Sequence, residues 1–155
     1  MITVIQDAET KQRVSRSILE ALPDWFGIPE ARETYIRESA DQLMMASWAG
    51  DEPNGFLCLN QTGCDTVELA VMGVLREYHR QGIGRSLFET ARSIAIEKGY
   101  SFMQVKTVQS GWYEEYDATN RFYQSRGFKE FEVMPTLWDK WNPCQIYVMA
   151  LESKN

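Results

Sequence analysis

Hydrophobic residues recur with two different spacings along this chain, and these spacings predict strands and helices. Alternating or continuous apolar runs of strand length occur at residues 2–5, 42–50, 55–61, 66–74, 101–108, 128–134 and 144–151. Apolar residues three and four positions apart predict helices within residues 7–22 and 83–98. A short helix is also expected after an exposed aromatic turn within residues 24–39, and another at residues 117–127. The expected order is βααβββαβαββ, which favours a mixed α/β (α+β) sheet in a single domain of residues 1–155.

Short polar and glycine signals indicate where several of these elements begin and end. Asp7 is a suitable N-cap for the first helix, and Pro23 stops that helix. Residues 51–54, with the sequence DEPN, have the composition of a turn and predict a hairpin between the second and third strands. Gly99 and Gly127 would end the last two helices.

Two glycines stand at the start of the clearest amphipathic helix, in the segment EYHRQGIGRSLFETA of residues 77–91. Unpaired backbone N–H groups at a helix start carry partial positive charge and bind phosphate oxygens well. Gly82 and Gly84 would let such oxygens approach the backbone, because neither residue has a side chain. Three arginines surround these glycines and favour an anion over a purely structural turn: Arg76, Arg80 and Arg85.

The spacing of the glycines does not fit two common nucleotide-binding loops. A P-loop requires GxxxxGK[ST], and neither Lys-Ser nor Lys-Thr follows the glycines, while a Rossmann turn would need a third glycine or alanine at Leu87. Gly73 interrupts the apolar strand of residues 66–74. Such a glycine marks either a bulge, which would open a slot beside the strand, or close packing against a large neighbour.

Composition narrows the class of the protein and of its partners. A chain of 155 residues with 44% hydrophobic and 25% charged residues can bury its own core. The net charge of −6 argues against nucleic acid or an anionic membrane as a partner. The start lacks the features of a signal peptide, and no segment approaches the ~18 apolar residues of a membrane span, so we expect a cytoplasmic protein. Three cysteines without CxxC spacing predict neither a disulfide framework nor a metal site: Cys58, Cys64 and Cys144.

The segment HRQGIG, residues 79–84, is similar to the Q/R-x-x-G-x-G/A pyrophosphate motif of the GNAT superfamily of acyl-CoA-dependent N-acyltransferases. The order of elements and the segment NRFYQSRGF, residues 120–128, also resemble this family, and the likeness extends over nearly the whole chain. His79 departs from the motif, which has Gln or Arg there, but the family binds mostly through main-chain amides at this turn. The resemblance implies a splayed central sheet flanked by helices, with acetyl-CoA or another acyl-CoA in the slot.

The same resemblance implies which residues would bind the acyl-CoA. The pantetheine arm would pair like an added strand with the backbone of Met72, Val74 and Leu75, and Asn120 would bond it directly or through water. One of the three arginines would reach the 3′-phosphate. The pyrophosphate would meet the following residues: His79, Arg80, Gln81, Gly82, Ile83, Gly84 and Arg85.

Acyl transfer to an amine needs a neutral nitrogen and a proton for the departing thiolate. Glu68 is an acid within an otherwise apolar strand, where the family often places its base; the alternative is an exposed strand position in water. Tyr123 matches the tyrosine acid of the family, and Phe122 beside it would then point into the core. The alternatives are a core role for Tyr123 and an acid supplied by Tyr113 or Tyr116.

The predicted function is that of an N-acetyltransferase. It would move an acetyl group from acetyl-CoA to a primary amine of a small molecule or peptide by direct transfer in a ternary complex. A covalent route through Cys144 is disfavoured, because no histidine is placed nearby to activate it. The first alternative is a non-catalytic acyl-CoA-binding or regulatory module on the same fold, and the second is a generic nucleotide-binding protein. Four aromatic residues would either enclose an apolar or cationic acceptor or pack a core or homodimer face: Trp25, Phe26, Trp138 and Trp141.

Overall fold

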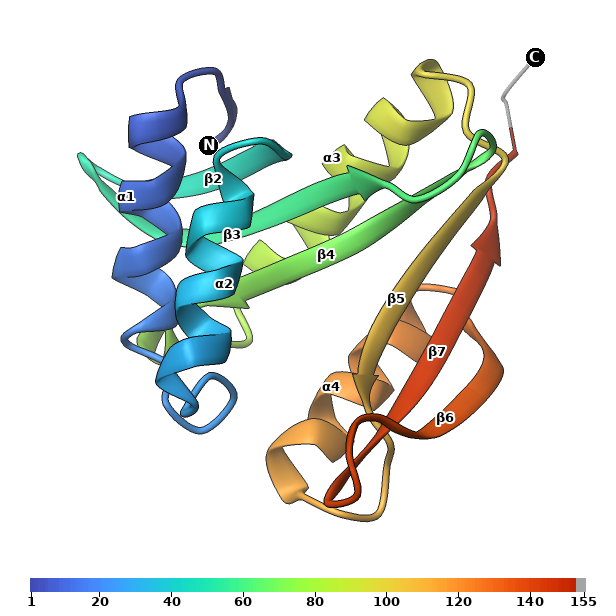
Figure 1. The fold of residues 1–155 in the computed structure, drawn as a ribbon. Coiled ribbons are helices and arrows are strands. Elements are labelled where there is room, and N and C mark those ends of the chain that lie inside the picture. The colour runs from blue at the N-terminus through green and yellow to red at the C-terminus, as the bar shows by residue number, and fades with distance from the viewer. Residues whose placement is uncertain (153–155) are drawn as a thin grey trace. The chain divides into compact units, whose positions relative to one another are not determined.

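The computed structural model describes residues 1–152, and its elements follow the expected order (Figure 1). The helices are α1 (Ala8–Leu19), α2 (Pro29–Ser39), α3 (Ile83–Glu97) and α4 (Glu114–Ser125), with a 3-10 turn, η1, at Arg76–Tyr78. The strands are β1 (Ile2–Ile5), β2 (Leu43–Ala49), β3 (Glu52–Gln61), β4 (Thr66–Val74), β5 (Phe102–Val108), β6 (Lys129–Asp139) and β7 (Asn142–Ala150). No helix among residues 1–152 is both long and apolar enough to cross a membrane.

The strands form a mixed sheet in the order β1-β2-β3-β4-β5-β7-β6. β4 and β5 are parallel, with Glu68 opposite Gln104. The pairs β1–β2, β2–β3, β5–β7 and β6–β7 are antiparallel. The predicted fold class and the predicted order βααβββαβαββ are therefore confirmed.

The chain divides into two compact units. The first unit contains Met1–Asn60 and Ala70–Ile94, and the second contains Gln61–Leu69 and the chain from Ala95 onward. Strand β4 passes from one unit to the other between Leu69 and Ala70. The expectation of one domain over residues 1–155 stays a prediction.

In the first unit, helices cover both faces of the strands (Figure 1). Apolar residues of α1 and α2 form a buried core with β2, β3 and β4, which explains the helical spacing of Val14 and Ile18. On the side of α3, an added Cβ at Gly55 of β3 would lie 3.0 Å from the Ile83 side chain. The apolar stripe of each helix therefore faces the strands.

Gly73 allows close packing between β4 and α1. An added Cβ at this position would lie 3.0 Å from the side chains of both Ile18 and Leu22. Buried and less buried residues alternate along β4 without interruption from Val67 to Gly73, as in a regular strand. The close-packing alternative is therefore the one that the structure supports.

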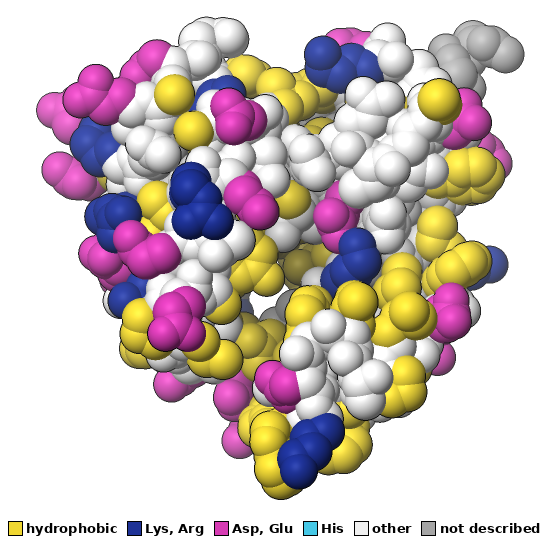
Figure 2. All heavy atoms as spheres, in the orientation of Figure 1, with side chains coloured by type: hydrophobic (Ala, Val, Ile, Leu, Met, Phe, Trp, Pro, Cys, Tyr) yellow, Lys and Arg dark blue, Asp and Glu magenta, His cyan; other side chains and the backbone are white. Residues whose placement is uncertain are grey.

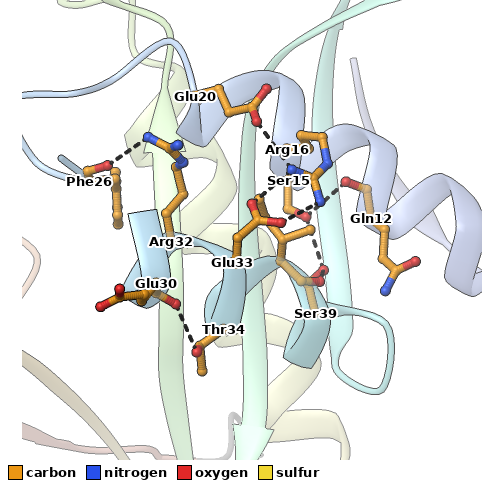
Figure 3. A network of polar contacts seen from close by, with 11 residues as sticks. Gln12, Ser15, Arg16, Glu20, Phe26, Glu30, Arg32, Glu33, Thr34 and Ser39 are labelled. Atoms are coloured by element: carbon orange, nitrogen blue, oxygen red, sulfur yellow. Dashed lines mark hydrogen bonds and ion pairs between the residues drawn. The ribbon is translucent and has the colours of Figure 1, made fainter. Parts of the chain in front are cut away.

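Polar contacts join α1 to α2, some exposed and some buried (Figure 3). Arg16 donates two hydrogen bonds to Glu33, of 2.8 and 2.9 Å, and this fork geometry lowers the pKa of the Glu33 carboxyl. The buried hydroxyls of Ser15 and Ser39 lie 3.0 Å apart and share a hydrogen bond. At the start of α1, the Asp7 carboxylate accepts the Thr10 N–H at 2.9 Å, so the predicted N-cap is confirmed.

In the second unit, α4 packs against β5 (Figure 1), and an aromatic contact joins it to β7. Tyr123 of α4 contacts Phe128 and Tyr147, with ring centroids 5.7 and 6.3 Å apart respectively. Figure 2 shows hydrophobic side chains gathered on the surface near β6, β7 and α4. The large exposed hydrophobic residues of this unit are Phe102, Trp112, Tyr113, Phe131, Leu137, Trp138 and Trp141.

Several predicted boundaries are wrong. Strand β6 ends at Asp139 rather than at residue 134, and helix α1 ends at Leu19 instead of extending to Pro23. The β2–β3 turn lies at Gly50 and Asp51 rather than at residues 51–54, because Gly50 adopts a left-handed φ of 64° and Glu52 already pairs with Ala49. Helix α4 starts at Glu114 instead of Asp117, whose carboxylate accepts the Gly111 N–H at 2.7 Å across the preceding turn. The errors at Gly50–Asp51 and at Asp117 come from turn chemistry close to the predicted ends of elements.

Candidate functional site

The glycine segment forms a tight reversal between the 3-10 turn and α3, entirely within the first unit. Gly82 has a φ of 80°, and its carbonyl accepts the N–H of Ser86 at 3.0 Å as helix α3 begins. The N–H groups of Ile83, Gly84 and Arg85 precede that first bonded turn and have no partner within the helix. This is the arrangement of donors that an anion requires.

Arg80 adopts an unusual backbone conformation at the centre of this reversal. It is the one non-glycine residue with positive φ among residues 1–152, with a value of 64°. For an L-residue with a Cβ, that conformation costs roughly 1–2 kcal/mol. The surrounding contacts must therefore hold the turn in place against this strain.

The three arginines near the turn differ in how their side chains are engaged. The Arg76 guanidinium forms an ion pair with Asp24 and lies 5.2 Å from the centre of the Trp25 ring. Within residues 1–152, the exposed side chains of Arg80 and Arg85 have no ion-pair or hydrogen-bond partner. Of the three, Arg80 and Arg85 are therefore the better candidates for binding a phosphate.

The end of β4 offers fewer free backbone groups than the sequence suggests. The Leu75 N–H donates to the Asn54 carbonyl, and the Leu75 carbonyl accepts the Tyr78 N–H, each at 2.9 Å. The Val74 carbonyl accepts a hydrogen bond of 2.7 Å from Nε2 of His79. Pairing of a ligand with Met72, Val74 and Leu75 stays a prediction, and both the Val74 carbonyl and the backbone of Leu75 already take part in hydrogen bonds.

Glu68 is paired with a lysine that the sequence analysis did not single out. The Lys106 ammonium donates to Oε2 of Glu68 at 2.6 Å, and the two residues lie on the same face of the parallel strands β4 and β5. The Glu68 side chain is 17% exposed, so it is not the fully solvated strand residue of the alternative interpretation. Its other oxygen, Oε1, has no hydrogen-bond partner within residues 1–152 and remains able to accept a proton or a water.

Tyr123 lies in the core of the second unit rather than on its surface. Its side chain is buried among Phe122, Phe128 and Tyr147. Phe122 is the more exposed of the neighbouring pair, and the Arg126 guanidinium lies 5.9 Å from the centre of its ring. The expectation that Phe122 fills the core is therefore wrong, whereas the acid role of Tyr123 stays a prediction.

Asn120 is the centre of a buried hydrogen-bond network. Its amide donates to the carbonyls of Val108 and Tyr116, at 2.8 and 2.7 Å, and its carbonyl oxygen accepts the Tyr147 hydroxyl at 2.5 Å. Burial, and to a lesser degree Glu130, raises the pKa of Tyr147, so this phenol stays protonated as the donor. The contact of Asn120 with pantetheine stays a prediction, and the network gives the residue a structural role beside it.

Replacing Asn120 by alanine is expected to lower the free energy of unfolding by about 2–4 kcal/mol, because the variant loses three buried hydrogen bonds and leaves the Tyr147 hydroxyl without its acceptor. Urea denaturation of the variant measures this change, with Arg121→Ala, an exposed position on the same helix, as the matched control. Unchanged stability together with weaker CoA binding would contradict the structural role and favour the ligand contact.

The remaining candidate side chains are distributed between core and surface. Trp25 and Phe26 pack against the core of the first unit, while Trp138 and Trp141 are 42% and 64% exposed in the second. The Tyr113 hydroxyl donates to the Trp141 carbonyl at 3.2 Å. Burial raises the pKa of Cys144 to about 11, so the thiol is protonated at neutral pH and is a poor nucleophile.

Comparison with known proteins identifies the family of this chain. The family model of the acetyltransferase (GNAT) domain matches residues 30–130. The chain belongs to the GNAT acetyltransferase family. Enzymes of this family bind an acyl-CoA and an amine acceptor. No curated protein sequence matches the chain.

Solved GNAT structures share this fold at low sequence identity. A protein classed in the GNAT family, from Desulfovibrio desulfuricans, is 18% identical, with a TM-score of 0.84 over 98% of this chain and 100% of its own. The ribosomal-protein-S18-alanine N-acetyltransferase of Escherichia coli is 18% identical, with a TM-score of 0.77 over 100% and 97% of the two chains. An aminoglycoside 6′-N-acetyltransferase complexed with coenzyme A is 15% identical, with a TM-score of 0.76 over 100% and 99%.

Proposed function

We propose that this protein is an acetyl-CoA-dependent N-acetyltransferase that acetylates a primary amine of a small molecule or peptide by direct transfer. The observation that carries the proposal is the turn at residues 79–85 in a chain of the GNAT family. The N–H groups of Ile83, Gly84 and Arg85 would donate to the pyrophosphate of acetyl-CoA, and the α3 dipole would favour its charge. Arg80 or Arg85 would bind the 3′-phosphate, since Arg76 is engaged by Asp24.

Two side chains of the second unit suit the proton transfers of this reaction. Glu68, through Oε1 or a bound water, would accept the proton of the acceptor ammonium, which in free solution titrates near 10.4. The neutral nitrogen then attacks the thioester carbonyl, an amide C–N bond forms and the C–S bond breaks. Tyr123 would donate its hydroxyl proton to the departing thiolate, and the second proton that the nitrogen loses on becoming an amide would return through water to the Tyr123 oxygen.

The class of acceptor is proposed as a primary amine without naming the molecule. Two of the structures with this fold carry the names of an aminoglycoside acetyltransferase and of an acetyltransferase acting on an alanine of a ribosomal protein. The fold therefore hosts both small-molecule and protein amines as acceptors. The net charge of −6 favours a cationic acceptor in either class.

Acetyl-CoA is expected to raise the melting temperature of the protein, whereas ATP and NAD are not. A ligand at 100 times its Kd stabilises the folded state by about 2.7 kcal/mol, which for a chain of this size is roughly 5–10 °C. Thermal denaturation with each nucleotide at the same concentration measures the shifts. Equal shifts with all three nucleotides would contradict the assignment to CoA.

Gly84→Trp is the companion variant, because an indole at the second helical residue would block the approach of the phosphates. Gly84→Ala is its matched control, since the family motif accepts alanine there and a methyl group leaves the amides accessible. Position 82 is unsuitable, because its left-handed φ of 80° would strain any side chain. A folded Gly84→Trp variant that still gives the full acetyl-CoA shift would mean that the turn has only a structural role.

Turnover separates the enzyme from a non-catalytic acyl-CoA-binding module. We expect release of free thiol from acetyl-CoA when a panel of primary amines, from aminoglycosides and polyamines to peptide N-termini, is supplied. Tight binding of acetyl-CoA without thiol release on any of them would favour the binding module.

A further inference from the structure

The single histidine of the chain is bonded to the strand that precedes the anion-binding turn. Nε2 of His79 lies 2.7 Å from the Val74 carbonyl oxygen. A carbonyl only accepts hydrogen bonds, so Nε2 must carry the proton, and this contact fixes the tautomer of the imidazole. Because the Leu75 N–H points to β3, the Val74 carbonyl points to the opposite edge of β4, where His79 holds it.

The connection between α1 and α2 contacts both the His79 imidazole and the Arg76 side chain. The Trp25 ring meets the His79 ring edge-on, with centroids 5.9 Å apart. The Arg76 guanidinium lies over the same indole and pairs with Asp24. Arg76, the first residue of η1, and His79, the residue that follows η1, thus both contact one short segment of the first unit.

This arrangement acts on the strained part of the turn. His79 immediately precedes Arg80, whose left-handed φ of 64° is unfavourable for a residue with a side chain. An anchor from His79 to Val74 would hold the reversal at Arg80 and keep the amides of residues 83–85 in one direction. Without it, Arg80 would be free to relax toward negative φ, and those amides would turn away from a phosphate at the helix start.

We propose that His79 is a positioning residue for the anion-binding turn, acting through its hydrogen bond to the Val74 carbonyl and supported by Trp25. This inference rests on the proposed function, because the ligand that benefits is the pyrophosphate of CoA. In this proposal the His79 side chain keeps the backbone of the turn in its binding conformation and takes no part in proton transfer.

The test compares two amides that differ only in reach. In His79→Gln the terminal NH₂ can occupy the place of Nε2, whereas in His79→Asn it stops near the place of Nδ1. We expect His79→Gln to bind coenzyme A like the wild type, and His79→Asn and His79→Phe to bind about 3- to 10-fold more weakly, the effect of one lost hydrogen bond. Isothermal titration calorimetry with coenzyme A gives the Kd, and urea denaturation gives the stability of each variant.

The possible outcomes separate this inference from the proposed function. Wild-type affinity in His79→Asn, or equal weakening in His79→Gln and His79→Asn, would overturn the positioning role, as would a loss of stability without a change in Kd. A wild-type protein that does not bind coenzyme A would overturn the proposed function and this inference with it. Because the chain has one histidine, a long-range ¹H–¹⁵N spectrum reads its tautomer directly. We expect the proton on Nε2, and a proton on Nδ1 would overturn the inference.

Discussion

Replacing Tyr123 by phenylalanine is expected to lower kcat for acetyl transfer by about 10- to 1000-fold, with little change in the affinity for acetyl-CoA. The substitution keeps the ring among Phe122, Phe128 and Tyr147 and removes only the hydroxyl that would protonate the thiolate. Steady-state kinetics with a good acceptor give kcat, and calorimetry with acetyl-CoA gives the affinity. A variant with wild-type kcat would transfer the role to Tyr113, Tyr116 or water.

Tyr147→Phe is the matched control, because it removes a phenol hydroxyl from the same aromatic cluster. The Tyr147 hydroxyl donates to Oδ1 of Asn120, so its loss leaves a buried acceptor without a partner. We expect this variant to lose about 1–3 kcal/mol of stability while kcat stays near the wild-type value. If both variants lost stability and neither lost kcat, Tyr123 would be a core residue like Tyr147.

Periodicity was sufficient to predict the fold, because most elements of this chain carry their own local signals. β4 has the predicted bounds of residues 66–74, and the cap at Asp7 and the stop at Gly99 lie where their residue types indicate. The errors lie at the ends of elements, as at the Gly50–Asp51 turn, where a single left-handed glycine decides the register. Apolar spacing contains no information about that choice.

The candidate site was less predictable than the fold, because its decisive contacts join residues distant in sequence. The glycine turn is a local motif and was found, and the left-handed Arg80 within it follows no composition rule. Lys106 lies 38 positions from Glu68, and Asp24 lies 52 positions from Arg76. The pair of Glu68 and Lys106 could have been suspected, because each is an ionisable residue within an otherwise apolar strand. Nothing in the sequence indicates the pair of Arg76 and Asp24.

Replacing Glu68 by glutamine is expected to lower kcat/KM most at neutral pH, by about 10²-fold, if Glu68 accepts the proton of the acceptor amine. The loss should shrink as the pH approaches the amine's own pKa of about 10.4, because the substrate then arrives neutral. Measuring kcat and KM separately from pH 6 to about 9.5 tests this expectation. A raised KM with intact kcat would instead mean that Glu68 only attracts a cationic acceptor.

The Lys106 contact requires a control for this experiment, since Glu68→Gln also removes the charge that the ammonium faces at 2.6 Å. The Lys106 side chain is 29% exposed, so the unpaired ammonium can reach water, and we expect the loss of stability to be small.

The double variant Glu68→Gln/Lys106→Met removes both charges together. If the kinetic defect of Glu68→Gln came from the unpaired lysine, the double variant would recover kcat/KM at pH 7. If Glu68 is the base, the double variant keeps the defect and its dependence on pH, because no other carboxylate takes the proton. Profiles that run parallel to the wild type in both variants, with unchanged kcat, would remove Glu68 from the mechanism.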